Sequence, residues 1–114
     1  MTDFIQVFTT VDDEAQAREL ARAVVGSRLV GCAQVLGPLQ SVYWWQGAVE
    51  EAREWLLLLK SRADLYPDLE ALLRRLHPYE TPEILAVPVS AGSDAYLAWL
   101  NRELRPRGGA VAHI

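Results

Sequence analysis

The alternation of hydrophobic and polar residues along the chain predicts a mixture of strands and helices. Residues 4–9 alternate with a period of two, which favours a strand. Apolar residues then recur at helical spacing over residues 17–25, after an acidic group at 12–14 that is typical of a helix start. The helix is expected to end at one of two glycines, Gly26 or Gly31, of which Gly31 is favoured.

The middle of the chain is dominated by two long apolar segments joined by a short turn. Gln46-Gly47 has the form of a two-residue hairpin turn, in which glycine supplies a positive φ. The segment before the turn is interrupted by Gly37-Pro38. The remaining elements are expected to be a strand at 32–45, a strand at 49–60, a helix at 64–76, a strand at 84–89 and a helix that begins at 92–94.

This order, β-α-β-β-α-β with one additional helix near the C-terminus, predicts an α+β, ferredoxin-like domain with an antiparallel sheet in the order 4-1-3-2. Pro38 lies in the second strand and Pro88 in the fourth, and this topology places both strands at edges, where proline is tolerated. The length of 114 residues suits a single domain over 1–114, with residues 105–114 as a tail of little pattern.

The hairpin carries more apolar surface than one chain of this kind can cover. Neighbouring residues on a strand point to opposite faces, so Trp44 and Trp45 cannot share one. Each buried aromatic of this size removes about 150–250 Å² from water. We therefore expect a second copy of the chain to cover Tyr43, Trp44, Trp45 and Trp55; the alternative is that the hairpin tip curls over its own sheet.

Charge and cysteine content narrow the class of protein. The net charge is −4 with no clustered basic run, which argues against a nucleic-acid partner. Arg74-Arg75, the one basic doublet, falls at a helix end, where it complements the helix dipole. The single cysteine, Cys32, excludes an intrachain disulfide. No apolar run approaches a membrane span and no signal segment is recognised, so a cytoplasmic location without a membrane partner is expected.

Several motifs in the same order and spacing make the chain similar to the CutA family, the divalent-cation tolerance proteins, over residues 4–104. The matching segments are VFTTVDDEAQARELA, RLVGCAQVLGPLQSVYWWQG, LLLLKSR and HPYETPEILAVPVSAGSDAYLAWL. The resemblance implies a compact homotrimer with a role in tolerance to copper and other divalent metals.

A copper site is the first function that this resemblance implies. Some relatives carry a cysteine at the end of the first strand and two adjacent histidines before Pro-Tyr. Here Phe8 and Leu76 replace the cysteine and one histidine, so His77 is the one ligand that remains. His77 as a ligand of Cu²⁺ or another divalent cation competes with His77 as a helix-end residue that hydrogen-bonds locally; His113 in the tail is a weaker candidate.

A cleft between subunits that binds a small molecule is the alternative, by analogy with PII signalling trimers. The residues at the matching family positions are Tyr43, Trp45, Lys60, His77, Tyr79 and Glu83. Against this interpretation, Lys60 and Glu83 could form an ion pair at a strand end while the aromatic residues only pack.

No catalytic motif is present, so we expect a protein that is not an enzyme and has no catalytic residues. There is no GxSxG, HExxH or glycine-rich phosphate loop. Glu50, Glu51 and Glu54 follow the turn and are expected to form a solvated rim. A stable scaffold that displays another surface is the third class of function left open.

Overall fold

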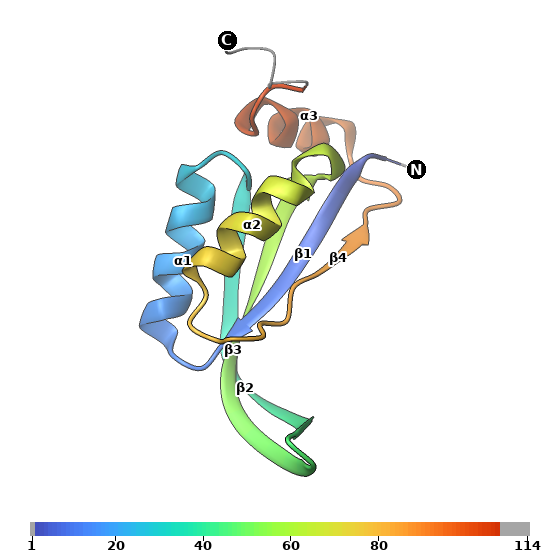
Figure 1. Cartoon of the computed structure of the whole chain (residues 1–114). Coiled ribbons are helices and arrows are strands. Elements are labelled where there is room, and N and C mark those ends of the chain that lie inside the picture. The colour runs from blue at the N-terminus through green and yellow to red at the C-terminus, as the bar shows by residue number, and fades with distance from the viewer. Residues whose placement is uncertain (1, 108–114) are drawn as a thin grey trace.

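The computed structural model describes residues 2–107 and confirms the expected α+β architecture. Four strands form one antiparallel sheet in the order β2-β3-β1-β4, which is the predicted order read from the other edge. Two of the helices cover one face of the sheet (Figure 1). The elements are β1 (Phe4–Val11), α1 (Glu14–Gly26), β2 (Cys32–Trp45), β3 (Ala48–Arg62), a 3-10 turn (Ala63–Leu65), α2 (Tyr66–Leu76), β4 (Leu85–Pro88) and α3 (Asp94–Glu103).

Local signals in the sequence set most of these boundaries. The Asp13 carboxylate caps α1 by accepting a hydrogen bond of 2.9 Å from the backbone N–H of Gln16. Ser93 caps α3 in the same way. Pro67 lies in the first turn of α2, where its missing N–H costs nothing. The two prolines at 38 and 88 lie on the edge strands, as expected.

The exit from α1 falls at Gly26, one of the two expected positions, and not at Gly31. The residue with left-handed backbone is Arg28, with φ of 65°. Gly31 serves packing instead, because a Cβ there would lie 2.5 Å from Cδ1 of Leu100. At the hairpin the prediction is confirmed: Gly47 has φ of 82°, and Gln46 also has positive φ.

The core lies between the sheet and the helices α1 and α2. Val7, Val11, Leu57 and Leu59 point from the central strands into this layer and have no exposed surface. The helices contribute Ala17, Leu20, Val24, Leu69 and Leu73. The core of one chain therefore lies on the helix-covered face of the sheet. The helices α1 and α2 do not cover the other face.

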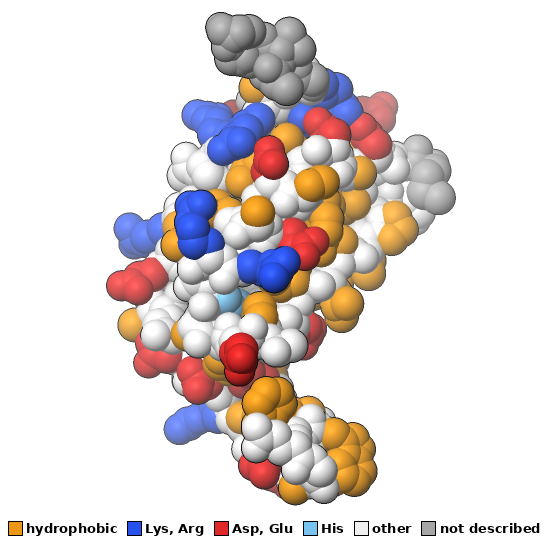
Figure 2. All heavy atoms as spheres, in the orientation of Figure 1, with side chains coloured by type: hydrophobic (Ala, Val, Ile, Leu, Met, Phe, Trp, Pro, Cys, Tyr) orange, Lys and Arg blue, Asp and Glu red, His pale blue; other side chains and the backbone are white. Residues whose placement is uncertain are grey.

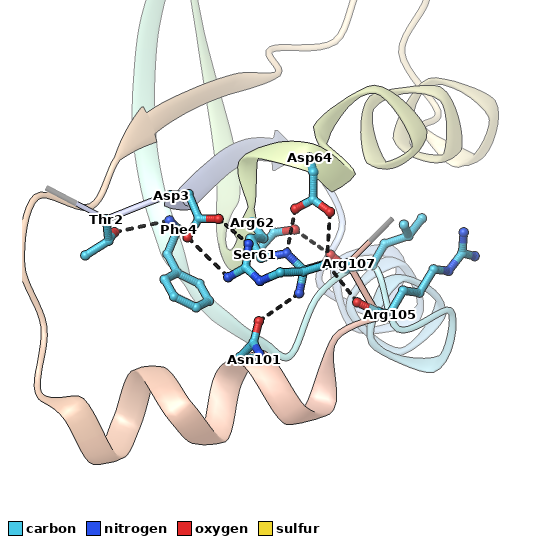
Figure 3. Close-up of polar contacts among 10 residues, drawn as sticks. Thr2, Asp3, Phe4, Ser61, Arg62, Asp64, Asn101, Arg105 and Arg107 are labelled. Carbon is cyan, nitrogen blue, oxygen red and sulfur yellow. Dashed lines mark hydrogen bonds and ion pairs between the residues drawn. The ribbon is translucent and has the colours of Figure 1, made fainter. Parts of the chain in front are cut away.

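Arg62, at the end of β3, joins the sheet to α3 and to the C-terminal segment (Figure 3). Its side chain has no exposed surface. The guanidinium donates to both carboxylate oxygens of Asp64, at 2.5 and 2.9 Å, to Oδ1 of Asn101 at 3.0 Å and to the carbonyl of Arg105 at 2.8 Å. The hydrogen bonds to Asp64 lower the pKa of its carboxyl group. Arg107 pairs with Asp3 beside this cluster and ties the two ends of the described chain together.

Close packing at Gly37 gives a first testable prediction. A Cβ at this position would lie 2.4 Å from Cδ1 of Trp55, and the indole is a rigid group that cannot move away cheaply. Gly37→Ala is therefore expected to lower the free energy of unfolding by about 1–3 kcal/mol, measured by urea denaturation. Gly26→Ala is the matched control, since nothing lies within 4 Å of its added Cβ. Equal stability of the two variants would contradict the packing described.

Candidate functional site: the open sheet face and the hairpin hollow

The face of the sheet opposite α1 and α2, which we call the open face, is apolar where water should favour polar residues. Antiparallel partners share a face, so Phe8 lies beside Leu58 and Leu85 in the middle of it. Leu36, Leu85 and Val87 are 47%, 58% and 43% exposed. The middle of this face therefore presents apolar side chains that residues 2–107 leave partly or largely exposed.

The hairpin of β2 and β3 projects beyond the body of the sheet (Figure 1). Hydrophobic side chains are prominent on this projection in Figure 2. Trp44 is 74% exposed, Trp45 47% and Tyr43 42%. The hairpin tip therefore does not bury its tryptophans against its own sheet, which removes the alternative in which one chain covers them.

Trp55 lies elsewhere. It is partly buried on the helix-covered face, where it packs on Gly37 and on the core. The place of Trp55 in a contact between copies stays a prediction. On the hairpin, Tyr43 and Trp45 lie on the side of the open face, and Trp44 is exposed on the opposite side.

A hollow of about 750 Å³ separates the hairpin from the segment between α2 and β4, and we call it the hairpin hollow. It contains four of the six residues predicted for a small-molecule cleft: Tyr43, Trp45, Tyr79 and Glu83. Its complete lining is Thr10, Asp12, Ser41, Val42, Tyr43, Trp45, Ala52, Glu54, Tyr79, Glu80, Thr81, Pro82 and Glu83. Trp44 is absent from the lining, as expected for the neighbour of Trp45 on a strand.

Lys60 does not belong to this group. It lies on β3 opposite Cys32, six residues along the strand from Glu54, which corresponds to about 20 Å. Its ammonium donates to Oε1 of Gln34 at 2.6 Å. No ion pair joins it to Glu83 among residues 2–107. The ion pair that we weighed against a cleft is therefore not formed within the described chain.

His77 holds the segment after α2 in place. Nδ1 of its ring accepts a hydrogen bond of 3.1 Å from the backbone N–H of Tyr79, so Nε2 carries the proton and donates to the carbonyl of Thr10 at 2.9 Å. The ring is 8% exposed and meets that of Tyr79 edge-on at 4.8 Å. Burial lowers the pKa of His77, although the Thr10 carbonyl and the carboxylates of Glu54 and Asp12 act in the opposite direction.

Glu54 is the residue of the site that sequence reasoning missed. We expected it in a solvated rim with Glu50 and Glu51, and for Glu54 this is wrong: it is 6% exposed. The phenol of Tyr79 donates to its Oε2 at 2.7 Å. Burial and this hydrogen bond raise the pKa of Tyr79, so the phenol stays protonated. Strand periodicity places Glu54 on the open face with Leu56 and Leu58, but it gives no signal that Glu54 is buried there.

A preformed metal site is not found in the part of the chain that the structure describes. Among residues 2–107 no three His, Cys, Asp or Glu side chains gather as metal ligands. Both nitrogens of His77 already hold backbone groups, and Cys32 lies half-buried at the start of β2. His113 lies outside the described residues. The residues of one chain therefore do not fit a high-affinity copper centre.

The ferredoxin-like α+β fold defines the class of this protein, and comparison with known proteins gives its family. The family model of the CutA1 divalent ion tolerance protein matches residues 5–103. This chain belongs to the CutA1 family.

Individual relatives agree with this assignment. The divalent-cation tolerance protein CutA of Thermus thermophilus is 44% identical over 95 residues, which cover 83% of this chain and 92% of that protein. The crystal structure of CutA from Xylella fastidiosa is 38% identical and superimposes with a TM-score of 0.87, covering 90% of this chain and 99% of that one. Mouse Protein CutA is 40% identical over 83% of this chain, which spans only 54% of its length.

One relative corrects the expected location. A CutA structure from Archaeoglobus fulgidus, 25% identical with a TM-score of 0.85 over 88% of this chain and 97% of that one, is described as the periplasmic divalent cation tolerance protein. The prediction of a cytoplasmic location is therefore wrong, because a protein with the same fold is described as periplasmic. Within residues 2–107, no helix has the length and apolar character needed to cross a membrane.

The neutral form of His77 makes stability depend on pH. Because the folded pKa lies below the usual 6.5, the unfolded chain binds the proton more readily. We expect the free energy of unfolding to fall as the pH drops through 6.5 and to level off below the folded pKa. Urea denaturation at pH 7.5, 6.5 and 5.5 measures this slope, and His77→Gln is expected to reduce it. An equal slope in both proteins would contradict the burial of a neutral ring.

Proposed function

We propose that this protein acts in divalent-cation tolerance as a homotrimer, without enzymatic activity, and that its copies meet through the open face and the hairpin. The observation that carries the proposal is the uncovered apolar surface centred on Phe8, Leu58 and Leu85. Exposed surfaces of this kind mark interfaces between proteins, and the edge strands β2 and β4 offer unpaired backbone groups beside it. The number of copies comes from the family resemblance.

The role of copper within this function stays a prediction. A copper ion at His77 would have to displace either the Thr10 carbonyl or the Tyr79 N–H from the ring. Such a site is weak in one chain, since a single imidazole supplies one ligand. The two hydrogen bonds of the ring instead make His77 a positioning residue of the segment after α2.

Isothermal titration with Cu²⁺ tests this role of His77. Wild type and His77→Ala, each shown by circular dichroism to be folded, are expected to bind Cu²⁺ with equal affinity and stoichiometry. His77→Gln serves as a second variant in case the alanine protein does not fold. Loss of a binding step in the variants would restore His77 as a copper ligand.

A second candidate function is the binding of a small molecule in a cleft between subunits, as in PII-like sensors. The specific observation in its favour is the hairpin hollow, which combines aromatic walls with a few oriented polar groups, a composition typical of ligand sites. The phenol of Tyr79 donates a hydrogen bond to Glu54, and its backbone N–H donates to the ring of His77. These bonds hold the polar side chains of the hollow in place without a ligand.

A further inference from the structure

Residues 77–83, which we call the connecting segment, lead from α2 to β4 without forming a helix or a strand. Side-chain hydrogen bonds hold this segment against the sheet. The phenol of Tyr79 donates to Oε2 of Glu54 on β3, and the backbone N–H of Tyr79 donates to Nδ1 of His77. These bonds place the segment along one wall of the hairpin hollow.

The ring of His77 anchors the connecting segment at the point where a strand pairing ends. β4 pairs with β1 from Ile5 to Phe8, and Thr10 lies beyond that pairing. Nε2 of His77 donates to the Thr10 carbonyl at 2.9 Å, so the ring supplies a hydrogen bond where β4 does not reach. Because the ring is 8% exposed, water does not readily replace its two partners.

This arrangement requires the neutral ring, because one nitrogen donates and the other accepts. A proton on Nδ1 of His77 would turn it from an acceptor into a donor that faces the N–H of Tyr79 at 3.1 Å. Two donors cannot share a hydrogen bond, so the backbone of Tyr79 would lose its partner. The bond at Nε2 needs no change, since that nitrogen carries a proton in both forms of the ring.

The charges around the ring favour uptake of this proton, and burial opposes it. The charged and titratable groups on the elements packed against His77 are Glu54 on β3, Asp12 after β1, Glu19 on α1, Arg74 and Arg75 on α2, and the phenol of Tyr79. The carboxylates of Glu54 and Asp12 favour the charged ring, whereas burial holds the pKa of His77 below its usual value. The two arginines are exposed and the phenol is uncharged.

We propose that His77 is a pH-sensitive latch: uptake of one proton at Nδ1 releases residues 78–83 from the ring and from β3, while the sheet and its helices stay folded. Release removes one wall of the hairpin hollow, so mild acid opens the hollow. The latch goes beyond the proposed function and acts within one chain, so it does not depend on the number of copies in the assembly.

Hydrogen exchange of the full chain at pH 7.5 and pH 5.5, corrected for the intrinsic effect of pH on exchange, tests the latch. The amides of residues 79–83 are expected to exchange severalfold faster at pH 5.5. The increase is at most about tenfold, because pH 5.5 lies one unit below the usual pKa of histidine. The amides of the buried strand segment around Leu57 and Leu59 are expected to stay protected over the same period.

His77→Asn separates the proton from the hydrogen bond. The Asn oxygen can accept from the N–H two residues further on, as in an Asx turn, and it does not titrate. Exchange of residues 79–83 in this variant is expected to be equal at the two pH values. His77→Gln, which also does not titrate, is the second variant in case the first does not fold. His113→Asn removes the other histidine and is the matched control, expected to respond to pH like wild type.

The latch is refuted by any of three results. One is equal protection of residues 79–83 at both pH values in wild type. Another is the same acid response in His77→Asn or His77→Gln as in wild type, which would place the titrating group elsewhere. The last is exchange of the connecting segment together with the buried strand at pH 5.5, which would indicate unfolding of the whole chain.

Discussion

Leu85→Lys is expected to abolish assembly of the protein while the single chain stays folded. In one chain the side chain of Leu85 is 58% exposed, so a lysine there keeps its ammonium in water. In an assembly that covers the open face, the same ammonium is buried without a partner, which costs several kcal/mol per copy. The penalty applies to every copy, so the oligomer is lost and the folded monomer remains.

Sedimentation velocity of Leu85→Lys at micromolar concentration measures this effect, and circular dichroism shows whether the chain is folded. Val25→Lys is the control: Val25 is 38% exposed at an outer position of α1, away from the open face, and its variant is expected to assemble like wild type. An assembled Leu85→Lys protein would show that copies meet elsewhere or that the open face stays exposed.

Arg62→Ala is expected to lower the free energy of unfolding by about 3–5 kcal/mol. The substitution removes a side chain with no exposed surface and leaves a cavity. It also leaves Asp64, Asn101 and the carbonyl of Arg105 without their common donor (Figure 3). The contacts of α3 and residues 105–107 with the sheet therefore lose their central link.

Urea denaturation at one fixed protein concentration measures this loss, since assembly makes apparent stability depend on concentration. Arg74→Ala is the control with the same change of side chain. Arg74 is exposed and faces Glu70 at 3.9 Å, so its removal is expected to cost at most about 1 kcal/mol. A similar small effect for Arg62→Ala would mean that the buried network adds little to the fold.

The sheet order could be predicted from the sequence because several local signals agree. Strand periodicity, the cap at Asp13, the turn at Gln46-Gly47 and the edge prolines all favour one topology. The ends of strands were less predictable: β3 continues past Lys60 to Arg62, and this extension brings the arginine to its partners.

The candidate site was predicted only in part, because its residues meet through tertiary contacts. Tyr43, Trp45, Tyr79 and Glu83 share the hollow, as the resemblance implied, whereas Lys60 lies far along the same face. The burial of Glu54 depends on the segment after α2 folding back over the strand, which no local pattern shows.

Mutual covering of the open face by copies of this chain is the premise of both the proposed assembly and the proposed cleft between subunits. Sedimentation equilibrium of the wild-type protein at low micromolar concentration tests it most directly. We expect a single species with three times the 12.8 kDa mass of the chain. A folded species of 12.8 kDa at that concentration would contradict it.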